Sequence, residues 1–181
     1  SDGTGSDGKE VGGLQLIVAD AGTGTVGGIN SSTYTFWQNV QTTATSSAFS
    51  TTNIQSDMNT IYLSLVRGAD SPDLIMADTN AYKSFLGSLQ AIQRVTSDRV
   101  ASSGFTSVQY LNSDVIFDDA CPANKMYFLN TDYLRLEVAA NRNFVPGEAK
   151  MSVNQDAMVT PMFWSGNLTC SNRALQGVIH T

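Results

Sequence analysis

The sequence predicts an α+β fold, in which two helices and a series of short strands surround one core. Residues 53–68 and 79–92 each carry apolar side chains at the spacing of one helical face. From residue 105 onward, short apolar runs alternate with turn residues, which is typical of strands. Because helices and strands do not alternate regularly, the order does not favour a parallel sheet of βαβ units.

The first quarter of the chain is predicted to contain no long helix. Residues 1–13 are rich in Gly, Ser and Asp, which predicts a flexible lead-in. The apolar run 14–18 predicts a strand, and residues 33–40 predict a short extended or irregular segment. Residues 41–52 are mostly Thr, Ser and Ala and predict a polar loop.

Gly22, Gly24 and Gly27 have the G-x-G-x-x-G spacing of a dinucleotide-binding turn. That turn needs a helix directly after the third glycine, because the phosphate binds at the helix N-terminus. Residues 28–36 are instead rich in turn, β-branched and aromatic residues. We therefore expect a glycine-rich loop between extended segments, and no bound nucleotide or other cofactor.

The first predicted helix begins near Thr52 or Asn53, either of which can act as the N-cap, and Gly68 can end it. Its apolar face consists of Ile54, Met58, Ile61, Tyr62 and Leu65. The run 72–77 follows a proline and predicts a buried strand. Asp78 is then the expected N-cap of the second helix. The apolar face of that helix consists of Tyr82, Phe85, Leu86, Leu89 and Ile92.

The second half of the chain is predicted to be mostly strands. Residues 93–104 predict a loop, and residues 105–119 predict a hairpin with Asn112 and Ser113 at its turn. A connection is expected over 141–150. The other strands are predicted at 125–130, 133–139, 157–170 (with interruptions at Pro161 and Gly166) and 174–180.

The composition favours a protein that packs against others. Charged residues make up 14% of the 181 residues, against about 25% in typical domains, whereas Ser and Thr occupy 38 positions. Such a surface costs little to desolvate, which suits either an assembly subunit or a secreted β-rich adhesin. The net charge is −6 and the basic residues are scattered, so the sequence shows no cluster of basic residues of the kind that binds nucleic acid. No apolar run is long enough for a transmembrane helix, and no signal peptide is visible.

No catalytic or metal-binding constellation stands out, so the sequence does not predict an enzyme. The single histidine, His180, lies beside the last residue, where a base would be poorly held. Cys121 and Cys170 lack metal-ligand spacing and are interpreted as buried thiols, with a disulfide between them as the alternative. Asp118 and Asp119 are adjacent at a predicted strand end, where neighbouring side chains point to opposite faces.

Four short segments of the sequence, taken in order, resemble the C-terminal part of a major capsid protein of a tailed double-stranded DNA bacteriophage or prophage. The resemblance covers nearly the whole chain after about residue 12, and no single motif in it is diagnostic. The segments are STYTFWQN (32–39), PDLIMADTNAY (72–82), CPANKMYFLNTDYL (121–134) and NQDAMVTPMFWSGNLTCSNRALQGV (154–178).

This resemblance implies an axial lobe and part of a peripheral lobe of the capsid-protein fold. Residues 1–45 would form the lead-in and a peripheral-lobe segment, 46–140 the axial lobe, and 141–181 the return strands of the peripheral lobe. The family's N-terminal arm, its spine helix and most of its extended loop have no counterpart in the sequence. The resemblance therefore implies a fragment or truncated form, and it gives no basis for an autocatalytic cross-link.

The function implied by the resemblance is that of a structural subunit that self-assembles into capsomers of an icosahedral shell. The shell would enclose DNA without binding it specifically, would form in the bacterial host cytoplasm and would belong to the virion. Arg94 and Arg99, in the loop expected near the capsomer axis, are the candidate contacts with neighbouring subunits. We expect the isolated chain to be a monomer or small oligomer. The alternative is a secreted Ser/Thr-rich adhesin or pilin-like β-domain, which would contain almost no helix.

Overall fold

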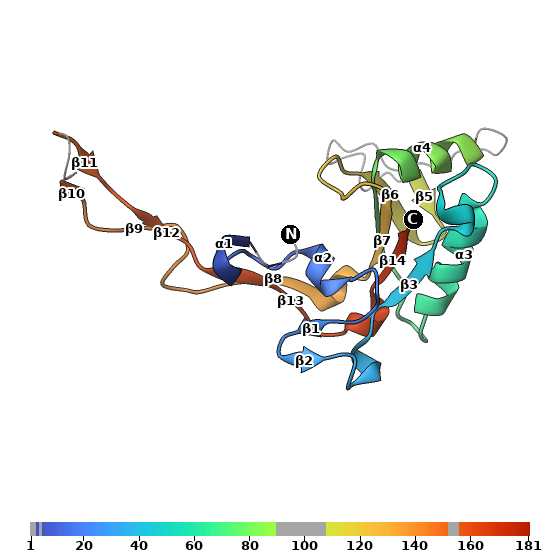
Figure 1. Cartoon of the computed structure of the whole chain (residues 1–181), viewed down its shortest axis with the longest axis horizontal. Helices are drawn as coiled ribbons and strands as arrows, with labels where there is room; N and C mark the ends of the chain where they lie inside the picture. The colour runs from blue at the N-terminus through green and yellow to red at the C-terminus, as the bar shows by residue number, and fades with distance from the viewer. Residues whose placement is uncertain (1–2, 4, 90–107, 152–155) are drawn as a thin grey trace.

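The computed structural model describes residues 3, 5–89, 108–151 and 156–181. Figure 1 shows a sheet with two helices packed on it, from which a long, narrow two-stranded ribbon projects to one side. The predicted loop over 93–104 lies outside the described residues, as do Ile92, Arg94 and Arg99. The predicted α+β class is confirmed, because helices and strands pack in one body without regular βαβ alternation.

The body is built on a six-stranded mixed sheet of order β3-β14-β7-β4-β6-β5. The pairs β14–β3 and β4–β6 are parallel, and the other three pairs are antiparallel. The sheet takes strands from all three segments into which the sequence was divided, and that division stays a prediction. The strands are β3 (Val40–Thr43), β4 (Leu74–Ala77), β5 (Val108–Tyr110), β6 (Ser113–Phe117), β7 (Lys125–Leu129) and β14 (Gly177–His180).

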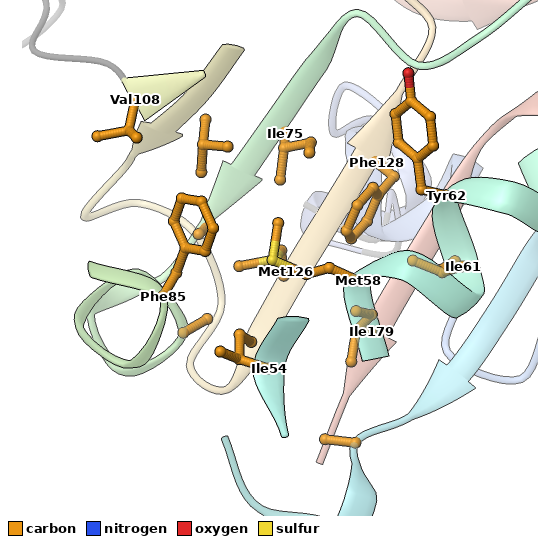
Figure 2. Close-up of a cluster of buried hydrophobic side chains, with 14 of the residues drawn as sticks. Ile54, Met58, Ile61, Tyr62, Ile75, Phe85, Val108, Met126, Phe128 and Ile179 are labelled. Carbon is orange, nitrogen blue, oxygen red and sulfur yellow. The ribbon is translucent and has the colours of Figure 1, made fainter. Parts of the chain in front are cut away.

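Helices α3 (Ile54–Leu65) and α4 (Thr79–Ser88) cover one face of this sheet. Helix α3 lies over β14 and β3, and α4 over β4 and β6. All five residues of the predicted α3 face are buried. Figure 2 shows four of them, Ile54, Met58, Ile61 and Tyr62, near sheet residues such as Ile75 and Phe128. At Gly177 a Cβ atom would lie 2.7 Å from Leu65 Cδ1, so the glycine allows α3 to approach β14 closely.

The ends of the two helices agree in part with the sequence. Asp78 is the N-cap of α4, as predicted: its Oδ1 accepts a hydrogen bond from the Ala81 amide at 2.8 Å. Asn53 occupies the N-cap of α3 but makes no side-chain capping bond. Helix α3 ends at Leu65, three residues before Gly68. Gly68 has a φ of +64° and lies in the turn that follows the helix.

The other face of the sheet is covered by an N-terminal strap, which we define as residues 14–39. It begins with α2 (Leu14–Ile17), so the strand predicted over 14–18 is wrong. A short apolar run cannot distinguish a strand from one buried helical turn, and here Ile17 and Val18 are both buried beneath the sheet. Ahead of the strap, α1 (Gly5–Gly8) is one turn containing Ser6 and Asp7 at positive φ.

The polar loop predicted over 41–52 is wrong at its start, because residues through Thr43 belong to β3. This edge strand pairs in parallel with β14, more than 130 residues later, so its stabilisation is not local. After it come η2 (Thr45–Ser47) and a loop that is tied to α3 by the buried Asp57. The Asp57 carboxylate accepts hydrogen bonds from the Thr45 amide at 3.0 Å and hydroxyl at 2.6 Å.

The hairpin of β5 and β6 is present as predicted, but its turn lies one residue earlier. Tyr110 pairs with Ser113, so Leu111 and Asn112 form the two-residue turn. Leu111 has a φ of +52°, which a two-residue hairpin turn of this kind requires but which is uncommon for leucine. The sequence signal of Asn and Ser therefore located the turn without fixing its register.

We define the ribbon as residues 134–170, which run out from the body and return to it. Its strands pair antiparallel: β8 (Leu134–Val138) with β13 (Gly166–Cys170), β9 (Val145–Pro146) with β12 (Met162–Phe163), and β10 (Lys150–Met151) with β11 (Met158–Val159). The predicted connection over 141–150 is therefore wrong, because it contains β9 and the first residue of β10. The predicted interruption at Pro161 does separate β11 from β12, but Gly166 is the first residue of β13 and the break before it lies at Trp164 and Ser165.

Candidate assembly surface

The ribbon carries most of the large apolar side chains that the body leaves uncovered. Among the described residues, fourteen large hydrophobic residues are exposed, and eight of them belong to the ribbon. Met151 is 73% exposed and Met158 69% exposed, values unusual for side chains of this kind in a folded domain. The eight are Leu136, Phe144, Val145, Met151, Met158, Val159, Met162 and Phe163.

Strand register places these apolar side chains on both faces of the ribbon. Met151 pairs with Met158, so the two share one face, and Val159 beside them points to the other face. In the next stretch, Phe163 pairs with Val145 on one face while Met162 points to the opposite one. A two-stranded ribbon is marginally stable when neither face is covered. Both faces of the ribbon are therefore available to pack against other surfaces.

Contacts within the ribbon give it a defined shape despite its exposure. The Arg142 guanidinium lies over the Phe163 ring, 4.8 Å from its centroid. The rings of Phe144 and Trp164 are 6.4 Å apart between centroids. Across the strands, the Ser165 amide donates to the Arg142 carbonyl at 2.9 Å. These three aromatic side chains are thus held by contacts within the ribbon itself.

The charges of the ribbon balance. Between residues 134 and 170 there are three basic side chains (Arg135, Arg142 and Lys150) and three acidic ones (Glu137, Glu148 and Asp156). A second copy of the same surface therefore meets no net repulsion, and opposite charges are available for pairing at the rim. This balance contrasts with the chain as a whole, whose net charge is −6.

A concave feature also lies on the body, between α4 and residues 47–51. It is an open groove with a volume of about 1000 Å³, and its wall includes Tyr82 and Phe117, whose ring centroids are 6.0 Å apart. Among the described residues, Lys83 is the only charged side chain in the groove lining. The described wall therefore offers van der Waals contact but no acid–base pair for chemistry.

The residues considered for catalysis are not brought together. His180 ends strand β14 in the sheet rather than a frayed terminus, and its Nε2 lies 3.2 Å from Gln41 Oε1. Asp118 follows β6 and accepts a hydrogen bond from the Ala120 amide at 2.9 Å, which makes it a turn residue. No cluster of three or more His, Cys, Asp or Glu side chains suited to a metal occurs in the part of the chain that the structure describes.

The glycine motif forms a tight hairpin. Strands β1 (Thr25–Val26) and β2 (Ile29–Asn30) pair antiparallel around Gly27 and Gly28, whose φ values are +61° and +79°. A two-residue hairpin turn with positive φ at both central positions favours glycine, which explains this pair. As expected, no helix begins directly after Gly27, but the segment before the glycine-rich stretch is helix α2 and not the predicted strand.

Both cysteines are free thiols, Cys121 buried and Cys170 half-buried, so the alternative of a disulfide between them is not the state observed. Burial, with the negative charges of Asp78 and Asp118, raises the pKa of Cys121 to about 12. Burial also raises the pKa of Cys170.

We expect neither thiol to react with Ellman's reagent within minutes at pH 8, because a thiol is protonated below its pKa and the thiolate is the nucleophile. Both thiols should react at once after unfolding in guanidinium chloride. Rapid release of one equivalent under native conditions would show that one of the two sites opens easily.

The exposed apolar surface of the ribbon is the candidate feature that the sequence pattern did not predict. One signal was present: three of the six methionines lie within residues 151–162, and methionine is frequent at adaptable contact surfaces. The proposed contacts Arg94 and Arg99 lie outside the described residues and stay a prediction. Within the described residues, no helix has the length and apolar character needed to span a membrane.

Comparison with solved structures identifies the fold. The chain is similar to the "Cyanophage A-1(L) capsid asymmetric unit", with a TM-score of 0.66 and 18% sequence identity over 93% of this chain and 58% of that one. It is also similar to the holo-SrpI encapsulin complex from Synechococcus elongatus PCC 7942, with a TM-score of 0.52 and 13% identity over 69% of this chain and 48% of that one. No protein-family model and no curated protein sequence matches the chain. The predicted capsid-protein fold is thus confirmed at the level of structure.

Proposed function

We propose that the chain is a structural subunit of an icosahedral capsid shell of the tailed-bacteriophage or prophage type, and that it acts by self-association rather than catalysis. The fold it shares with a cyanophage capsid chain supports the proposal over almost its whole length. It spans little more than half of that capsid chain, so the assembly of a complete shell is part of the proposal. The encapsulin likeness is weaker and covers less of the chain.

The ribbon is the observation that carries the proposal. Its eight exposed apolar residues are divided between the two faces of the ribbon, so each face presents part of their surface. A standard interface buries about 800 Å² on each partner, so contact with a neighbour would also include polar atoms of the ribbon. Because the surface covers both faces of a projecting element, it suits contact with two neighbouring copies.

The remaining parts of the proposal follow from charge and composition. A net negative subunit with scattered basic residues would enclose DNA without a specific binding site. The shell would belong to the virion and would form in the host cytoplasm. The adhesin alternative receives no support from either structural neighbour, and the tandem helices α3 and α4 do not suit an almost helix-free domain.

Light scattering coupled to size-exclusion chromatography over a concentration series tests the proposal. We expect a monomer at low micromolar concentration and small oligomers at higher concentration. Oligomer formation should strengthen in sulfate, because excluded salts favour burial of apolar surface. A chain that stays monomeric at hundreds of micromolar in sulfate would contradict self-association. Negative-stain images showing closed shells would contradict the expectation that the chain represents a fragment.

A further inference from the structure

Arg173 is fully buried at the point where the ribbon joins the body. It lies in η4 (Arg173–Leu175), between ribbon strand β13 and sheet strand β14. Its guanidinium donates to the Ile17 carbonyl at 2.5 Å and to the Ser31 hydroxyl at 3.1 Å. Longer contacts reach three further strap carbonyls, those of Thr23 and Gly24 at 3.4 Å and of Trp37 at 3.5 Å. One side chain thus gathers acceptors spread along most of the strap.

None of these partners carries a negative charge. A buried guanidinium without a carboxylate is costly, and it persists only where several hydrogen bonds compensate its lost hydration. Burial accordingly lowers the pKa of Arg173 from its ordinary value. A planar fork with five N–H donors can serve acceptors in several directions at once, whereas a lysine ammonium cannot reproduce that geometry. The site is therefore specific for arginine.

The strap packs against the root of the ribbon as well as against the sheet. Leu14 and Leu16 belong to the same apolar cluster as Leu134, the first residue of the ribbon, and Leu168, near its end. Just before the strap, the Gly12 amide donates to Asn167 Oδ1 in β13 at 2.8 Å. The strap thus contacts both strands at the ribbon root.

The strap is also fixed to the sheet by contacts that do not involve Arg173. Asp20 forms an ion pair with Lys125 of β7 at 2.6 Å, and β3, which continues the strap, pairs with β14. Two short connections join the ribbon to the sheet. The Gln176 side chain in one connection accepts a hydrogen bond from the Asn130 amide in the other and donates one to the Asn130 carbonyl, both at 3.0 Å. These contacts would remain if the guanidinium were removed.

We propose that Arg173 is a positioning residue that locks the ribbon at a fixed angle to the six-stranded sheet by clamping the strap into the ribbon root. The inference rests on the proposed function, in which the ribbon contacts neighbouring subunits. A single ribbon angle would give every subunit the same geometry of contact, and loss of the clamp would let the angle vary from copy to copy.

Electron–electron distance measurements between two spin labels test the clamp directly. One label replaces Lys150 on the outer ribbon and the other replaces Leu63 on the exposed side of α3, as Lys150→Cys and Leu63→Cys. A labelling ratio of two per chain would show that the native thiols stay unlabelled. The parent should give one narrow distance distribution, and Arg173→Met should at least double its width. Arg173→Lys should behave like Arg173→Met, because the fork geometry is lost while the charge is kept.

Arg135→Met is the matched control, because this exposed ribbon arginine makes no side-chain bond to the strap among the described residues, and it should leave the width unchanged. Hydrogen exchange should show strap amides exchanging at least tenfold faster in Arg173→Met, with α3 amides unaffected. If the Arg173 variants do not fold, Leu16→Asp loosens the strap by another route and should broaden the distribution in the same way.

An unchanged width in a folded variant with fast-exchanging strap amides would overturn the proposal, since the strap would then not set the angle. The distances are measured on dilute, unassembled chain, so their outcome is independent of whether the ribbon is an interface.

Discussion

The double substitution Met158→Glu and Met162→Glu is expected to weaken self-association of the chain at least 100-fold, which corresponds to about 2.8 kcal/mol. Both side chains are exposed in the isolated chain, at 69% and 66%, so the carboxylates remain hydrated there and the fold should lose little stability. In an interface the same carboxylates would have to be desolvated without a partner. Sedimentation velocity over a concentration series measures the change in dissociation constant.

The matched control places the same charges on the body. Leu63 on α3 and Leu111 at the β5–β6 turn are 70% and 60% exposed, so Leu63→Glu and Leu111→Glu add equal charge away from the ribbon. We expect this pair to change association much less. Equal effects of the two pairs would mean that net charge, and not the ribbon surface, governs association.

Single substitutions can then separate the two ribbon faces. Met158 and Val159 are adjacent and point to opposite faces. If both faces meet neighbours, Met158→Glu and Val159→Glu should each weaken association.

Phe128→Ala is expected to lower the free energy of unfolding by about 3–5 kcal/mol, the usual cost of removing a fully buried aromatic ring. Phe128 is 0% exposed and lies in β7 opposite Gly177 of β14 on one side and Ile75 of β4 on the other. Figure 2 places its ring among the residues of α3 and the sheet. The substitution would therefore leave a cavity at the centre of the core, which neither the helix nor the sheet can fill by a small shift.

Chemical denaturation followed by circular dichroism measures this loss. Leu63→Ala is the control, because the side chain is exposed on the same helix that covers Phe128, and its change should stay within about 0.5 kcal/mol. A loss below about 1 kcal/mol for Phe128→Ala would contradict the close packing of α3 on the sheet.

The sequence was most informative where an element is stabilised locally. The apolar face of α3, the strand β4 and the Asp78 cap of α4 could all be predicted because spacing and capping chemistry lie within a few residues. Edge strand β3 could not be predicted, since its partner β14 is remote in sequence and its own residues are mostly Thr and Gln.

The two features on which the proposals rest, the ribbon surface and Arg173, could not be found by pattern analysis, for physical reasons. The ribbon has apolar residues on both faces, which produces neither a clean alternation nor a helical period. Arg173 looks like a surface residue, because charged side chains usually are. Its acceptors lie between 136 and 156 residues earlier in the chain, so no local signal reveals the clamp.

The position of β14 in the sheet also determines when the body can form during synthesis. This strand lies between β3 and β7, so the sheet is divided until residues 177–180 have left the ribosome. At roughly 5–20 residues per second, the interval between completing β7 and completing β14 lasts about 3–10 seconds. During that time Met126 and Phe128, which are fully buried in the finished protein, have no β14 beside them. The nascent chain therefore passes through a state with an open apolar edge, and general chaperones that bind such surfaces would have time to act before folding is complete.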